Sequence, residues 1–97
     1  MAKAYVIGTM DVHDMDHYGT YTPHTPGIIA KFGGQFIVRG GKVEHLEGEP
    51  PKSRNVVIEF PSFEQAQAFY HSEEYGKIIG IRHAASTGNF YLVEGAD

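Results

Sequence analysis

Two glycine pairs bracket a short apolar run at residues 32–41, and this segment constrains the fold more than any other part of the chain. Glycine adopts positive φ without a Cβ clash, so Gly33-Gly34 is expected to end a helix and Gly40-Gly41 to form a turn or bulge. The residues between them, 35–38, are expected to form a strand. Arg39 follows that strand beside two positions without side chains, where a ligand or another backbone could approach.

The remaining segments predict strands that alternate with helices. Strands are expected at 4–12, at 35–38 with a continuation or partner at 42–46, at 55–60 and at 89–94. A first helix is expected at 15–32, and Pro23 and Pro26 should kink it or divide it in two. A second helix is expected after a capping box at Ser62 and Gln65, and a third at 73–82. The order β-α-β-β-α-β predicts one α+β domain over residues 1–97, a ferredoxin-like antiparallel sheet with helices on one face.

The expected strands carry apolar residues on both faces of that sheet. In the strand at 55–60, Val56 and Ile58 point one way and Val57 the other, and in the last strand Phe90 and Tyr91 divide in the same manner. A sheet with one solvated face alternates more cleanly than this. A symmetric partner chain is the simplest cover for the second face, so a homodimer is expected.

Composition excludes several classes of function. The 97 residues have a net charge of −4 and scattered basic residues, which argues against nucleic acid as a partner. No cysteine is present, so disulfides and thiolate chemistry are excluded. The apolar run near the N-terminus is too short for a signal peptide or a membrane span, so we expect a cytoplasmic protein without membrane contact.

The common enzyme motifs are missing from the sequence. It contains no GxSxG elbow, P-loop, HExxH motif or dinucleotide-binding GxGxxG, and no cofactor is implied. His13 and His17 are four residues apart and could be metal ligands, but they straddle the expected start of a helix. That pattern is too weak to predict a metal site. His24, His45 and His83 are interpreted as surface residues.

The arginines are the first candidates for ligand binding. Arg39 offers a planar fork of donors that suits a carboxylate or phosphate, and the alternative is an ion pair with Glu59 or with a carboxylate across a dimer. Arg82 lies near the end of an otherwise apolar helical face, where it could contact a ligand or simply stabilise the helix dipole. Arg54 is interpreted as a surface or interface residue that forms an ion pair.

Tyrosines and one histidine complete the set of candidates. Tyr18, Tyr70 and Tyr75 are amphipathic and could line a partly polar pocket, although most such tyrosines are core residues with one hydrogen bond. His71 could act as a general base near neutral pH, because an ordinary histidine titrates near ~6.5. The alternative is that His71 is simply solvated.

Three motifs in order, at 32–41, 54–63 and 69–75, resemble the small bacterial proteins of the domain of unknown function 1330 family. The resemblance covers nearly the whole chain and implies a ferredoxin-like fold that pairs into a dimeric α/β barrel. That wider group includes antibiotic-biosynthesis monooxygenases, muconolactone isomerases and EthD-like proteins, but the resemblance implies no established reaction. The family pattern maps onto Tyr18, Pro26, Gly33-Gly34, Arg39-Gly40-Gly41, Arg54, Glu59-Phe60-Pro61, Tyr70, Ser72, Tyr75 and Arg82. The chain departs from it at 21–25, where Pro23 and His24 replace plain helix formers.

Residues and resemblance together predict binding of a small organic molecule with an acidic or carbonyl group. Arg39 would anchor the ligand, Arg82 and His71 would add polar contacts, and the three tyrosines would line the walls. Fold analogy suggests cofactor-free oxygenation or isomerisation as the chemistry of any turnover. The alternative is a non-catalytic dimeric module for ligand sensing or structure, and the sequence leaves open whether the protein is an enzyme.

Overall fold

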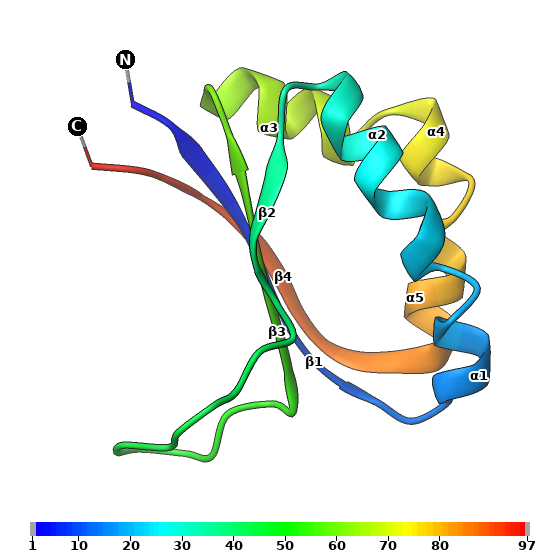
Figure 1. The fold of residues 1–97 in the computed structure, drawn as a ribbon, viewed down its shortest axis with the longest axis vertical. Coiled ribbons are helices and arrows are strands. Elements are labelled where there is room, and N and C mark those ends of the chain that lie inside the picture. Colours follow the sequence, from blue (N-terminus) through cyan, green and yellow to red (C-terminus); the bar gives the residue numbers. More distant parts are fainter. Residues whose placement is uncertain (1, 97) are drawn as a thin grey trace.

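A computed structural model describes residues 2–96 of the chain. It confirms the α+β class and the β-α-β-β-α-β order, with every helix on one side of a four-stranded antiparallel sheet (Figure 1). The elements in order are β1 (Ala4–Val12), α1 (Met15–Tyr18), the 3-10 helix η1 (Thr22–His24), α2 (Thr25–Lys31), β2 (Gln35–Arg39), β3 (Arg54–Phe60), α3 (Phe63–Tyr70), α4 (Glu73–Gly76), α5 (Ile79–Ala85) and β4 (Ser86–Glu94).

The sheet has the strand order β2-β3-β1-β4, so β1 and β3 are central and β2 and β4 form the edges. Residues of period two along β1 and β3 are buried toward the helices, and Val6 pairs with both Ile58 and Leu92 in one row. The core therefore lies between the sheet and the helical layer. Its largest fully buried side chains are Tyr75, Phe60, Phe69 and Ile29.

Local hydrogen bonds explain where the helices begin and end. The Ser62 hydroxyl accepts a hydrogen bond from the Gln65 N–H at 3.2 Å, which confirms the predicted cap of α3. At the end of α2, Gly33 has a φ of 80°, and the N–H groups of Gly33 and Gly34 donate to the carbonyls of Ala30 and Ile29. This is the Schellman pattern, and it confirms that the first glycine pair ends a helix.

The helical segments are more divided than the sequence predicted. Residues 15–32 form three pieces rather than one kinked or two-piece helix, because Pro23 and Pro26 each lie in the first turn of a new piece. Proline is accepted there since the first N–H groups of a helix have no partner inside the helix. The predicted helix at 73–82 likewise divides into α4 and α5.

Two strand predictions are wrong. Residues 42–46 form no strand; they belong to an irregular segment at 41–53, here called the β2–β3 arm, that projects away from the sheet (Figure 1). Beyond Arg39 no residue of the arm pairs with β3, so its Val43 and Leu46 remain exposed. The last strand begins at Ser86 and not at Asn89, because Ser86, Thr87 and Gly88 pair with the end of β1.

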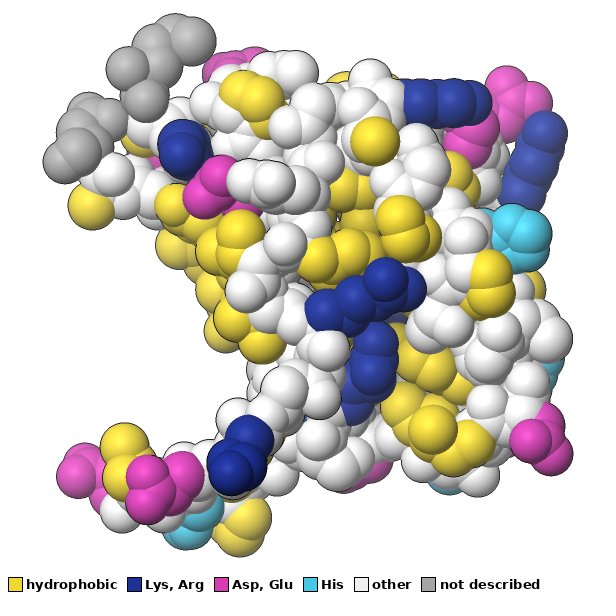
Figure 2. All heavy atoms as spheres, viewed as in Figure 1, with side chains coloured by type: hydrophobic (Ala, Val, Ile, Leu, Met, Phe, Trp, Pro, Cys, Tyr) yellow, Lys and Arg dark blue, Asp and Glu magenta, His cyan; other side chains and the backbone are white. Residues whose placement is uncertain are grey.

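The face of the sheet away from the helices is apolar as well. One row of paired residues crosses all four strands, namely Val38, Val57, Ile7 and Tyr91. Tyr91 is 50% exposed and Val38 is 41% exposed. Figure 2 shows hydrophobic side chains on the flank above the projecting arm. Both faces of the sheet therefore carry apolar residues, as the sequence indicated.

No helix in residues 2–96 is long and apolar enough to cross a membrane, and the longest, α3, has eight residues.

Candidate functional site

A β-bulge turns Arg39 toward the helices. Phe36 pairs with Ile58, but the next pairs are Val38 with Val57 and Arg39 with Val56, so β2 holds one residue more than β3 between these points. Phe36 points to the helical side, so strict alternation would point Arg39 to the outer face of the sheet. The extra residue of the bulge returns Arg39 to the helical side. The sequence predicted a turn or bulge at Gly40-Gly41, whereas the register shift lies before Arg39.

The Arg39 guanidinium lies against the helical layer. Its Nη2 donates a hydrogen bond to the Thr22 carbonyl at 3.0 Å, and its Cζ stands 4.5 Å from the centre of the Phe36 ring. Glu59 lies elsewhere and contacts Lys3, Tyr5 and Gln35. The ion pair between Arg39 and Glu59, which the sequence left open, does not form in this structure.

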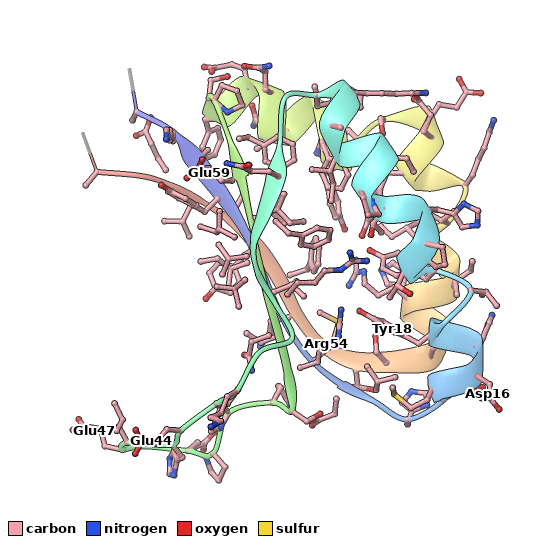
Figure 3. The ribbon with its side chains drawn as sticks, viewed as in Figure 1. Asp16, Tyr18, Glu44, Glu47, Arg54 and Glu59 are labelled. Atoms are coloured by element: carbon pink, nitrogen blue, oxygen red, sulfur yellow. The ribbon has the colours of Figure 1, made fainter. Side chains whose placement is uncertain are left out.

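Arg54, the first residue of β3, points into the same space from the neighbouring strand. Its Nε donates to the Tyr18 hydroxyl at 3.2 Å, and that hydroxyl in turn lies 3.5 Å from the Met10 sulfur. Figure 3 shows Arg54 and Tyr18 directed toward each other between the sheet and α1. Gly40 makes room for this arginine, because a Cβ there would lie 2.6 Å from Arg54 Nη1.

Arg82 enters from α5 and is the most deeply placed of the three arginines, with 7% of its surface exposed. Its Nε donates to the Tyr75 hydroxyl at 3.2 Å, and its Cζ lies 4.1 Å from the centre of the Phe90 ring. Tyr75 is hydrogen-bonded to Tyr21 through the two hydroxyls. Arg82 is thus linked through two phenols to the space beside Arg39 and Arg54.

These six residues are here called the arginine–tyrosine cluster: Arg39, Arg54, Arg82, Tyr18, Tyr21 and Tyr75. The cluster contains every arginine in the chain. Within residues 2–96, the ion pairs join lysines to carboxylates, namely Lys3 to Glu59, Lys31 to Glu74 and Lys52 to Asp11, and none includes an arginine. Arg82 is buried and Arg54 is half-buried, whereas Arg39 is exposed at the surface. Buried or half-buried charges are normally compensated, so Arg82 and Arg54 without carboxylates are suited to an anion, with Arg39 at the solvent side.

Burial keeps the phenols of the cluster protonated. It raises the pKa of Tyr21, with Tyr75 adding to the effect, and it also raises the pKa of Tyr75. Both are therefore neutral hydroxyls at neutral pH. Burial disfavours the charge on Arg82, but the oxygens of Tyr75 and Tyr21 outweigh this and hold the pKa of Arg82 above its ordinary value.

A small cavity, here called the central cavity, lies beside four of the six cluster residues; Arg82 and Tyr75 do not line it. Its volume is about 20 Å³, and Arg39, Arg54, Tyr18 and Tyr21 line it together with apolar residues of the sheet and α2. Such a space holds roughly one water molecule. Figure 2 shows basic side chains in the middle of one face of the molecule, bordered by hydrophobic ones.

Sequence comparison identifies the family. The profile of the family described as Domain of unknown function (DUF1330) matches residues 3–96. The chain belongs to this family. The resemblance inferred from the three motifs is thereby confirmed. No curated protein matches the sequence.

Solved structures resemble this DUF1330 chain in fold. RPA0582, a protein of unknown function from Rhodopseudomonas palustris, superimposes with a TM-score of 0.79 at 14% identity, covering 99% of this chain and 84% of that chain. Methylated RPA0582 gives 0.78 at 13% identity, covering 99% and 82%. SnoaB, a cofactor-independent oxygenase from Streptomyces nogalater, gives 0.65 at 14% identity, covering 100% and 96%. The ferredoxin-like α+β fold is confirmed, and at these identities the likeness is one of fold alone.

The structure divides the predicted site residues of the DUF1330 chain into two groups. Four of them meet in the arginine–tyrosine cluster: Arg39, Arg82, Tyr18 and Tyr75. The others, Tyr70 and His71, lie at the end of α3 on a separate groove beside β4, with their rings 5.3 Å apart. Within the described residues, no group of three acidic or histidine side chains is placed to hold a metal ion, and His13 and His17 join none.

Sequence reasoning missed two members of the cluster. Arg54 was interpreted as a surface or interface residue, and Tyr21, in the segment that departs from the family pattern, was not among the candidates. The spacing of Tyr18 and Tyr21 was an available signal, since residues three apart share one side of a helical turn. Their ring centres are 5.4 Å apart.

Proposed function

We propose that this protein binds a small organic acid or carbonyl compound at the arginine–tyrosine cluster. The observation that supports this is the convergence of Arg39, Arg54 and Arg82 with no carboxylate of the described residues within ion-pair distance. Arginine carries five N–H donors in a planar fork that matches a carboxylate, and charge-assisted hydrogen bonds of this kind are the strong ones. Removing one should weaken binding measurably.

The three arginines have different roles in the proposed site. Arg39 and Arg54 lie at the mouth and would meet the anion first, and each uses one N–H on a protein oxygen. Arg82 lies deeper and is nearly excluded from water, so its attraction for an anion is less screened. The neutral hydroxyls of Tyr21 and Tyr75 complete a polar wall that can donate to an oxygen of the ligand.

Binding is proposed in preference to turnover. The likeness to SnoaB, a cofactor-independent oxygenase, is one of fold, and fold does not decide function. Among the residues described, the lining of the central cavity includes no carboxylate and no histidine, and the cluster phenols have raised pKa values. His71, the base that the sequence suggested, lies on the other groove. The cluster therefore favours stabilising an anion over abstracting a proton.

The proposed functional unit is a homodimer joined through the outer face of the sheet. The apolar row Val38, Val57, Ile7 and Tyr91 would otherwise face water. The β2–β3 arm projects on the same side and carries the exposed Val43 and Leu46, so it could contact a second copy (Figures 1 and 2). Closed symmetric dimers are the commonest oligomers, and an apolar sheet face suits one.

Calorimetric titration with benzoate and with benzyl alcohol, its uncharged analogue, tests the anion site. We expect wild-type protein to bind benzoate and not benzyl alcohol. Arg39→Ala should weaken benzoate binding by about tenfold or more, the equivalent of one lost charge-assisted hydrogen bond. Lys42→Ala removes the same charge from the exposed arm and should leave the affinity unchanged. Equal affinities for Arg39→Ala and wild type, or equal binding of the alcohol, would refute the proposal.

A further inference from the structure

A second, larger cavity lies between α3 and the edge strand β4. Its volume is about 340 Å³, within the range of small-molecule sites. Residues of β1 and β4 form the floor and residues of α3 form the wall: Val6, Phe90, Tyr91 and Leu92 from the strands, and Phe63, Ala66, Gln67, Tyr70 and His71 from α3 and its end. The groove is thus mainly apolar and aromatic.

One aromatic ring separates this groove from the arginine–tyrosine cluster. Phe90 lines both the groove and the small central cavity. On one side it stacks against the Arg82 guanidinium at 4.1 Å, and on the other its ring centre lies 6.0 Å from that of Tyr70. Phe90 is half-buried, and its ring packs over Gly8, where a Cβ would lie 2.7 Å from the ring.

The two cavities are complementary in size and in charge. The central cavity has cations and phenols but only about 20 Å³, room for roughly one water molecule, so an organic body does not fit there. The groove has the space, but its lining includes no lysine or arginine. A ligand with an anionic head and an apolar body would use both.

We propose that the groove takes the aromatic or apolar body of an amphipathic organic acid whose carboxylate lies on the side of the central cavity, against Arg39 and Arg54, with Phe90 as a movable partition between the two. This inference rests on the proposed anion site and adds the class of ligand to it. The head is held by charge-assisted hydrogen bonds and the body by burial of apolar surface in the groove. In this proposal the Phe90 ring, which lines both cavities, would turn so that the two spaces join.

The experiment compares 4-phenylbutanoate with butanoate, which has the same head and chain but no ring, by titration of the wild-type protein. We expect the phenyl group to increase affinity by about tenfold or more, or about 1.4 kcal/mol. Gln67→Trp fills the groove from an exposed position of α3 and should reduce that gain to less than about threefold. Gln67→Ala is the matched control and should retain it.

The outcomes separate this inference from the anion site. If both acids bind equally well to wild-type protein, the anion site stands and the groove is not part of it. The inference is also overturned if Gln67→Trp keeps the phenyl gain, or if that variant abolishes self-association, which would assign the groove to a second copy of the chain. If neither acid binds, the anion site and the inference fall together.

Discussion

At the scale of single residues, the proposed function depends on the arginines and tyrosines of the cluster. Lysines form ion pairs with carboxylates at the surface. Arg39, Arg54 and Arg82 contact carbonyl, hydroxyl and aromatic groups, and Arg82 Nη2 also lies 3.5 Å from His83 Nε2. The sequence identified two of these arginines because each has a marked local context, a glycine pair or an apolar helical face. It could not identify Arg54, because only the fold brings the start of β3 beside Tyr18.

The buried phenols predict a loss of stability at alkaline pH. Because Tyr21 and Tyr75 have raised pKa values when folded, the unfolded chain loses these protons first. Their contribution is complete below about pH 10 and is lost as the pH rises further. The free energy of unfolding should then fall by up to about 1.4 kcal/mol per pH unit for each tyrosine.

Urea unfolding of wild type and Tyr21→Phe between about pH 8 and pH 11 checks this prediction. The variant should lose about 1 kcal/mol at neutral pH, because one buried hydrogen bond is removed, and should show a shallower decline above about pH 10. Identical pH slopes for wild type and Tyr21→Phe would contradict the assignment.

At the scale of strands and helices, the sequence predicted which elements exist better than it predicted where their side chains point. The long periodic strands β1 and β3 were predicted to within one residue. The start of β4 was missed because Ser86–Gly88 lack an apolar pattern and are strand only through pairing with β1. The bulge in β2 could not be predicted from the sequence, because Ile37 and Val38 are both exposed yet apolar and so show no polar–apolar alternation.

Deletion of Ile37 tests the bulge. Removing one residue from a regular strand turns every later side chain to the other face. In β2 the deletion should instead restore regular pairing of Val38 with Val57 and leave Arg39 on the helical side. Benzoate affinity should then stay within about threefold of wild type. A loss of binding in a folded deletion variant would show that Arg39 had turned outward.

At the scale of the whole molecule, the two faces of the sheet differ in what they carry. The inner face carries the core and the arginine–tyrosine cluster, and the outer face carries an apolar row that a second copy could cover. The chain has a net charge of −4, so its overall field does not attract anions. Any selectivity for an acid must come from the local cluster.

Light scattering after size-exclusion chromatography tests the proposed dimer. Wild-type protein should have twice the chain mass of 10.7 kDa. Val57→Asp places a charge at the centre of the apolar row and should yield a monomer, whereas Ala30→Asp, on an exposed position of α2, should remain dimeric. A monomeric wild-type protein would refute the proposed dimer. A dimer that Val57→Asp leaves intact would place the interface on another surface.

The central claim is that one anion binds at the arginine–tyrosine cluster, beside Arg39 and Arg54 and linked through Tyr21 and Tyr75 to Arg82. The most direct measurement is a nuclear magnetic resonance titration that follows the Nε–H signals of Arg39, Arg54 and Arg82 as benzoate is added. We predict saturable shifts of all three signals with one dissociation constant, and none with benzyl alcohol. If the three signals do not move while benzoate binds, or if they move with unrelated affinities, the arginine–tyrosine cluster is not the site.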